Sequence, residues 1–163
     1  MPEAPRKIAV RCRVNGDDVT LRDYPMARLL DALRNNLGLA GIKEGCGEGE
    51  CGACSIEMDG KLVNSCLVPV AQAEGVTIRT IEGVATSGQL NSVQQAFISF
   101  GGAQCGICTP GMILAAVNLL EQNAQPDEAD IRAALAGNLC RCTGYMRIVE
   151  AVRRACERTE AAK

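Results

Sequence analysis

Ten cysteines and no histidine occur in this chain of 163 residues, and eight of the cysteines fall into two groups of four. The first group places Cys46, Cys51 and Cys54 in a C-x4-C-x2-C spacing, and Cys66 follows twelve positions later. This spacing is that of a plant-type [2Fe–2S] ferredoxin loop, in which four thiolates hold the cluster. The group therefore predicts an iron–sulfur site and, with it, electron-transfer chemistry.

Glycines between these cysteines support the same interpretation. Gly45, Gly47, Gly49 and Gly52 permit positive φ angles and let backbone N–H groups approach a negatively charged cluster closely. A four-cysteine zinc site and disulfide bonds are the alternatives for this group. Zinc sites usually show paired C-x2-C units, which this loop lacks.

The second group consists of Cys105-x2-Cys108 and, after a long gap, Cys140-x-Cys142. A threonine follows each pair, and threonine is a favoured N-cap residue, so each pair is expected just before a helix. Two helix N-termini would direct the positive ends of their dipoles at one anionic cluster. A thioredoxin-like redox pair is the alternative for C-x2-C, but that motif belongs beside a βαβ unit, and none is evident.

Composition excludes several other kinds of site. Without histidine there is no Ser-His-Asp triad, no Rieske cluster and no two-cysteine, two-histidine zinc finger. The net charge of −2 provides no excess of positive charge for nucleic acid. No long apolar run predicts a membrane span, and the polar N-terminus lacks the apolar core of a signal peptide, so we expect a cytoplasmic chain. The remaining cysteines, Cys12 and Cys156, are expected to pack as small hydrophobic residues.

Strands around one helix are expected to position the first group. Alternating apolar residues predict a strand over 8–14 and a hairpin partner over 19–22. Leucines at helical spacing predict a helix that begins at Asp23 and ends at Leu37. A second hairpin over 55–64 and a strand over 76–81 complete a small β-grasp-like unit.

Four helices are expected to position the second group, over residues 92–100, 112–120, 128–135 and 146–154. The second of these is apolar on almost all sides, which is typical of the buried centre of a bundle. Thr86-Ser87-Gly88 is the expected linker, so the domains span 1–84 and 85–163. The sequence thus predicts an α+β chain, with an N-terminal β-grasp, plant-type [2Fe–2S] ferredoxin-like domain and a C-terminal four-helix-bundle [2Fe–2S]-binding domain.

Three ordered stretches of this sequence resemble the iron–sulfur subunit of the xanthine oxidase family, the molybdenum hydroxylases. They are residues 45–54, 104–111 and 137–145, and the resemblance extends over roughly residues 8 to 155. One departure is Ile107, where the family usually has phenylalanine. Both side chains are apolar, so we expect a change in packing and no loss of a ligand.

The resemblance implies an electron relay with no substrate site of its own, carrying two [2Fe–2S] clusters within a xanthine dehydrogenase-like oxidoreductase. Its partners would be a large molybdopterin-binding subunit and a medium FAD-binding subunit, in a heterotrimer or a dimer of heterotrimers. The helical domain's cluster would lie nearer the molybdenum and the plant-type cluster nearer the flavin, with Gln104 and Cys142 close to the pterin. A free-standing two-cluster ferredoxin and a zinc-based binding module are the alternatives.

Overall fold

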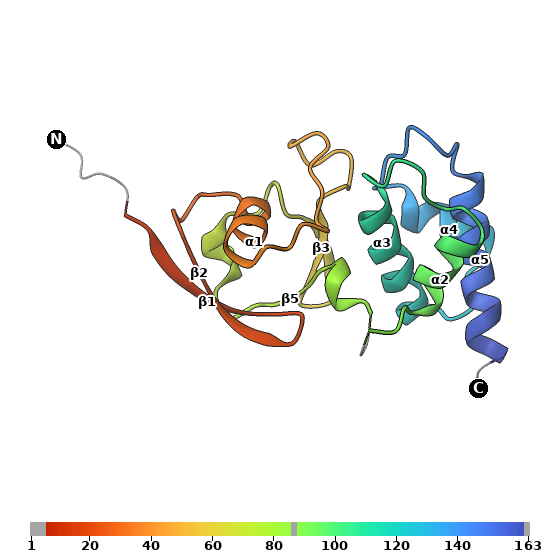
Figure 1. Ribbon diagram of the computed structural model, residues 1–163, viewed down its shortest axis with the longest axis horizontal. Helices are drawn as coiled ribbons and strands as arrows, with labels where there is room; N and C mark the ends of the chain where they lie inside the picture. Colours follow the sequence, from red (N-terminus) through yellow and green to blue (C-terminus); the bar gives the residue numbers. More distant parts are fainter. Residues whose placement is uncertain (1–5, 86–87, 162–163) are drawn as a thin grey trace.

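The computed structural model describes residues 6–85 and 88–161 and contains two parts side by side, one built on a sheet and one of helices (Figure 1). The expected linker residues Thr86 and Ser87 lie outside the described residues. Among the described residues, no helix is long and apolar enough to cross a membrane. The chain is α+β, as predicted. The elements of the first part are, in order, β1 (Ile8–Val14), β2 (Asp17–Asp23), α1 (Leu29–Leu37), β3 (Ser55–Met58), β4 (Lys61–Asn64), the short 3₁₀ turn η1 (Val70–Ala73), β5 (Thr77–Arg79) and the 3₁₀ turn η2 (Ile81–Gly83). The helices that follow are α2 (Ser92–Ser99), α3 (Thr109–Gln122), α4 (Glu128–Leu135) and α5 (Met146–Ala161).

The first part is a mixed five-stranded sheet in the order β2-β1-β5-β3-β4. β1 pairs antiparallel with β2 and parallel with β5, and β3 lies antiparallel between β5 and β4. Val10, Cys12 and Val14 of β1 are buried in the core of the sheet, as their alternation predicts. Leu30 and Leu33 of α1 pack in the same core. The sheet and this single helix hold the loop that carries the first cysteine group.

Helix α1 begins later than the sequence predicts. It starts at Leu29 and not at Asp23. The residues before it pair with a distant segment: Arg28 forms a bridge with Pro69, and the Leu29 N–H donates to the Val68 carbonyl at 2.8 Å. These long-range bonds hold the backbone of this segment extended, and the local helix pattern does not override them.

Two further boundaries differ from the prediction. The strand expected over 76–81 is limited to Thr77–Arg79, because Ile81–Gly83 turns into a 3₁₀ segment. The helix expected over 112–120 already begins at Thr109, and Cys108 occupies its N-cap. A cysteine of the second group therefore lies at the start of this helix itself.

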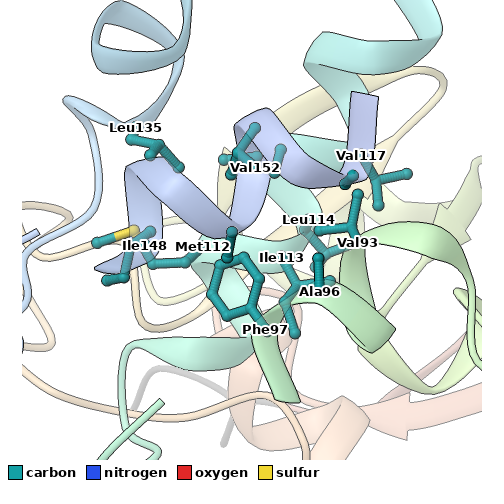
Figure 2. Close-up of a cluster of buried hydrophobic side chains, with 14 of the residues drawn as sticks. Val93, Ala96, Phe97, Met112, Ile113, Leu114, Val117, Leu135, Ile148 and Val152 are labelled. Atoms are coloured by element: carbon teal, nitrogen blue, oxygen red, sulfur yellow. The ribbon is translucent and has the colours of Figure 1, made fainter. Parts of the chain in front are cut away.

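Helix α3 lies at the centre of the second part. Its residues Gly111–Val117 are all buried, so the prediction of a helix buried on all sides holds for this stretch, while its last turn is partly exposed. Figure 2 shows Met112 of α3 surrounded by side chains of its neighbours, and the core includes Phe97 of α2, Leu135 of α4 and Ile148 of α5. Four helices thus share one apolar core, which holds the two segments of the second cysteine group.

The two parts are joined by direct contacts, with α3 facing β3 (Figure 1). Arg79 of β5 donates to both carboxylate oxygens of Glu121 on α3, at 2.7 and 2.6 Å, and also to Glu57 of β3. The hydrogen bonds from Arg79 hold the pKa of Glu121 below its usual value, so this carboxylate is charged at neutral pH. Leu62 of β4 packs against the helical core. The sheet and the helices are therefore held in a fixed relation.

Candidate metal centres

The loop before β3 brings the first four cysteines together as two contacting pairs. A side-chain hydrogen bond links Cys46 to Cys51, and another links Cys54 to Cys66. Cys54 and Cys66 are only 3% and 4% exposed, whereas Cys46 lies at the surface. Cys66 follows the β3–β4 hairpin, so the hairpin returns the distant fourth cysteine to the loop, as the sequence predicts.

Backbone N–H groups surround the exposed sulfur of the first group. The amides of Glu48 and Glu50 both donate to Cys46 Sγ at 3.4 Å. The loop makes this turn with positive φ angles of 72° at Gly47 and 79° at Gly49, which glycine adopts without strain. These hydrogen bonds lower the pKa of Cys46 to about 7, which favours the thiolate that a metal requires.

The buried cysteines behave in the opposite way. Burial raises the pKa of the Cys54 thiol to about 11 and that of the Cys108 thiol to about 12. Both thiols therefore hold a proton at neutral pH unless a cation takes its place, since metal binding releases the protons of its thiol ligands. Each cysteine group thus combines surface thiols with buried ones.

The second group also forms two contacting pairs. Cys142 and Cys105 have their Sγ atoms 3.5 Å apart, and a side-chain hydrogen bond links Cys108 to Cys140. Each cysteine of the C-x2-C pair thus contacts a cysteine of the C-x-C pair. This arrangement disagrees with a thioredoxin-like redox pair, in which the two cysteines of C-x2-C react with each other.

Two side chains contact Cys140 of the second group: Thr143, which the sequence predicts only as a helix N-cap, and Tyr145, which the sequence does not single out. Thr143 Oγ1 lies 3.1 Å from Cys140 Sγ, and the Cys140 N–H donates to the Tyr145 hydroxyl at 2.9 Å. Tyr145 has a φ of +67°, which few residues other than glycine adopt. Burial opposes ionisation of Cys140, but hydrogen bonds from Thr143, Cys142 and Cys108 together outweigh it and leave the pKa of this thiol lowered. Helix α5 begins at Met146, after this turn rather than at Thr143.

Both cysteine groups border one open cleft of about 180 Å³. The groups are therefore neighbours in space, although a long stretch of sequence separates them. The lining residues are Gly45, Cys51 and Ala53 from the first loop and Cys105, Ile107, Cys108, Leu139, Cys140, Arg141 and Cys142 from the helical part.

The arrangement of the sulfur atoms fits two-iron cores. Among the described residues, no three Cys, Asp or Glu side chains converge on a single metal-ion position, and all ten cysteines are free thiols. A zinc site needs four ligands around one ion, whereas a [2Fe–2S] core takes two pairs, one for each iron. The buried Thr109 hydroxyl, beside Cys108, has no hydrogen-bond partner in the described part of the chain. It is a donor available at the second site, and the residues present fit two [2Fe–2S] clusters.

The remaining predicted site residue, Gln104, directly precedes Cys105 and is exposed, as is Cys142. Their contact with a pterin involves another chain and stays a prediction. Asn138 is a polar residue that sequence reasoning did not identify, although it is only 4% exposed. Its one sequence signal is its place directly before Leu139 and Cys140, at the start of the C-x-C segment.

Comparison with known proteins assigns both halves of the chain. Residues 12–78 match the family model of the 2Fe-2S iron-sulfur cluster binding domain, and residues 80–153 match that of the [2Fe-2S] binding domain. Each matched segment contains one complete group of four cysteines.

Relatives that align over nearly the whole chain agree with this assignment. The nicotinate dehydrogenase small FeS subunit of Eubacterium barkeri is 49% identical over 152 residues, which are 93% of this chain and 97% of the relative. The xanthine dehydrogenase iron-sulfur-binding subunit of Escherichia coli O157:H7 is 47% identical over 158 residues, or 94% and 96% of the two chains. The crystal structure of quinoline 2-oxidoreductase from Pseudomonas putida 86 matches with a TM-score of 0.91 and 38% identity, over 96% of this chain and 98% of that one. The chain therefore belongs to the small [2Fe–2S] subunits of the xanthine oxidase family.

Proposed function

We propose that this chain is the electron-transfer subunit of a molybdenum-dependent dehydrogenase or hydroxylase, relaying single electrons between the molybdopterin of a large subunit and the FAD of a medium subunit. The observation that carries the proposal is the presence of two groups of four cysteines, each in two contacting pairs. All four cysteines of the second group and Cys51 of the first line one cleft. When bound, each [2Fe–2S] cluster supplies a one-electron redox centre. The relatives named as nicotinate and xanthine dehydrogenase subunits support this role.

The chain's own contribution is to bind and separate the two centres. Cys46, Cys51, Cys54 and Cys66 hold the first cluster, and the second cluster is held by Cys105, Cys108, Cys140 and Cys142. Buried cysteines in each group anchor the cluster in the protein, and surface cysteines leave one side of it open. An edge that is accessible in this way is what a relay between subunits requires.

The domain division that we propose, 1–84 and 85–163, has support from the two apolar cores. Ile78 is the last buried residue of the first core. Val84, the last residue of the first proposed domain, already packs in the second core, so the change of core falls between residues 78 and 84, just before the proposed boundary. The mixed sheet with α1 corresponds to a β-grasp unit, and α2 to α5 correspond to a four-helix bundle around one core.

The second centre faces the molybdenum subunit in this proposal, and the first faces the flavin subunit. Exposure of Gln104 and Cys142 supports their contact with the pterin of the large subunit. The assembly is a heterotrimer or a dimer of heterotrimers, and substrate is oxidised outside this chain. A free-standing ferredoxin is less well supported, because relatives that align over almost their full length are named as subunits.

Replacement of one cysteine tests the assignment of the two sites. In the reduced enzyme, Cys51→Ser removes one of two [2Fe–2S] signals in the electron paramagnetic resonance spectrum and lowers iron to about half of the four atoms per chain that two clusters supply. The matched control is Cys12→Ala, because Cys12 is buried in the sheet core and belongs to neither group. It keeps both signals. Retention of both signals in Cys51→Ser, or loss of one in Cys12→Ala, contradicts the assignment.

A further inference from the structure

The two cysteine groups are connected by a hydrogen bond between main-chain atoms. The Leu139 N–H donates to the Cys51 carbonyl at 2.9 Å. Leu139 is followed directly by Cys140 of the second group, and Cys51 belongs to the first. A single hydrogen bond therefore joins the main chain of one cysteine site directly to the main chain of the other.

The side chain of Asn138 holds this contact in place. Its Nδ2 donates to the Gly52 carbonyl at 2.9 Å, in buried surroundings. The same carbonyl accepts from the N–H of Ser55 at 3.1 Å and from its Oγ at 2.8 Å. Asn138 is 4% exposed, and nearly all buried polar side chains in proteins have a hydrogen-bond partner. The bond from Asn138 is the one that crosses from the helical part to the first loop at this carbonyl.

Glycines on both sides make the contact close. A Cβ atom on Gly52, which has a φ of +67°, would lie 2.4 Å from Asn138 Nδ2. A Cβ atom on Gly111, in the first turn of α3, would lie 2.2 Å from the Gly52 carbonyl oxygen. Three segments thus meet at this point: the first loop, the start of α3 and the segment before Cys140. There is no room between them for a methyl group.

We propose that Asn138 is a positioning residue that fixes the distance and relative orientation of the two cysteine sites. Electron transfer through protein weakens steeply with distance, so the spacing of the two centres sets how well one passes an electron to the other. The bond from Asn138 to Gly52 keeps the Leu139–Cys51 hydrogen bond formed. The inference rests on the proposed function, because it assumes that each of the two sites holds a cluster.

The substitution Asn138→Asp tests the inference because it keeps the shape of the side chain and replaces the Nδ2 donor by an acceptor opposite the Gly52 carbonyl. The Gly52 carbonyl keeps its two hydrogen bonds from Ser55, but it then faces an acceptor where Asn138 donates, and the bond between the two parts is lost. Asn64→Asp is the matched control. Asn64 Nδ2 donates to the Gly49 carbonyl at 2.6 Å in the same loop, but this bond stays within the first part.

Two measurements on the assembled enzyme serve as readouts: the magnetic splitting between the two reduced clusters, and hydrogen exchange of the peptide that contains Leu139. Asn138→Asp changes the splitting and speeds exchange of this amide by roughly tenfold or more, with the iron content retained. Asn64→Asp leaves the splitting and this exchange as in the unmodified protein.

An unchanged splitting and unchanged exchange in Asn138→Asp overturn the inference, as do equal changes in both variants. If Asn138→Asp does not retain iron, Gly111→Ala decides by the same measurements, because its methyl group is forced against the Gly52 carbonyl while Asn138 remains. A changed splitting then supports the inference and an unchanged one overturns it. Absence of a second cluster from the unmodified enzyme would instead count against the proposed function.

Discussion

Backbone amides donate to sulfur at both sites, and at the second site a hydroxyl does so as well. At the first, backbone amides of Glu48 and Glu50 donate to Cys46. At the second, the hydroxyl of Thr143 lies against Cys140. Hydrogen bonds to cluster sulfurs are among the factors that set the reduction potential. One hydrogen bond to sulfur at the second site therefore comes from a side chain that a single substitution can remove without altering the backbone.

Thr143→Val is expected to lower the reduction potential of the second cluster and leave that of the first unchanged. The hydroxyl, 3.1 Å from Cys140 Sγ, stabilises the more negative, reduced state by donating to the sulfur. Its loss corresponds to about 1 kcal/mol, or on the order of tens of millivolts for a one-electron couple. Potentiometric titration followed by electron paramagnetic resonance measures both potentials.

The conservative change Thr143→Ser keeps the hydroxyl and serves as the control, with a potential close to that of the unmodified protein. A second-cluster potential that stays constant in Thr143→Val, or that falls equally in Thr143→Ser, would show that the hydroxyl does not act on the sulfur.

At the scale of elements, the first cysteine loop is limited by the space around its sulfurs. A Cβ atom on Gly45 would lie 2.8 Å from Cys51 Sγ. Gly45→Ala is therefore expected to displace this sulfur and empty the first site, so that iron falls to about half of the four atoms that two clusters hold. Iron analysis and the loss of one of the two spectroscopic signals measure the effect.

Gly60→Ala is the matched control in the turn between β3 and β4. Gly60 has a φ of +79° and nothing within 4 Å of an added Cβ. The alanine costs about 1–2 kcal/mol of backbone strain and lowers the unfolding temperature, but both clusters remain. If Gly45→Ala retains all its iron, or Gly60→Ala loses half, the spatial argument for the loop is wrong.

The spacing of the cysteines was sufficient to predict which of them gather, because ligand spacing is a local property of the chain. The burial of α3 followed equally from its apolar residues. The predicted start of α1 was wrong, because the bridge from Arg28 to Pro69 is a long-range contact that leaves no pattern in the local sequence. For the same reason, the sequence did not single out Asn138 or Tyr145. Each acts through a hydrogen bond to a partner that comes close only when the chain is folded.

At the scale of the whole molecule, α3 links the two halves of the relay. Cys108 lies at its N-cap, and Glu121 near its other end is bound to Arg79 of the sheet. The first turn of the helix also abuts the Gly52 carbonyl through Gly111. The helix that carries a cysteine of one group at its N-cap is thus fixed against the part that holds the other group. This rigidity suits a permanent component of a larger enzyme.

The presence of two separate [2Fe–2S] clusters in one chain is the basis of the proposed electron relay. Iron, zinc and acid-labile sulfide, measured per chain in the enzyme purified with its partner subunits, test it most directly. About four iron atoms and about four sulfides per chain are expected, with no stoichiometric zinc. A full complement of zinc, or sulfide sufficient for only one cluster, would contradict it.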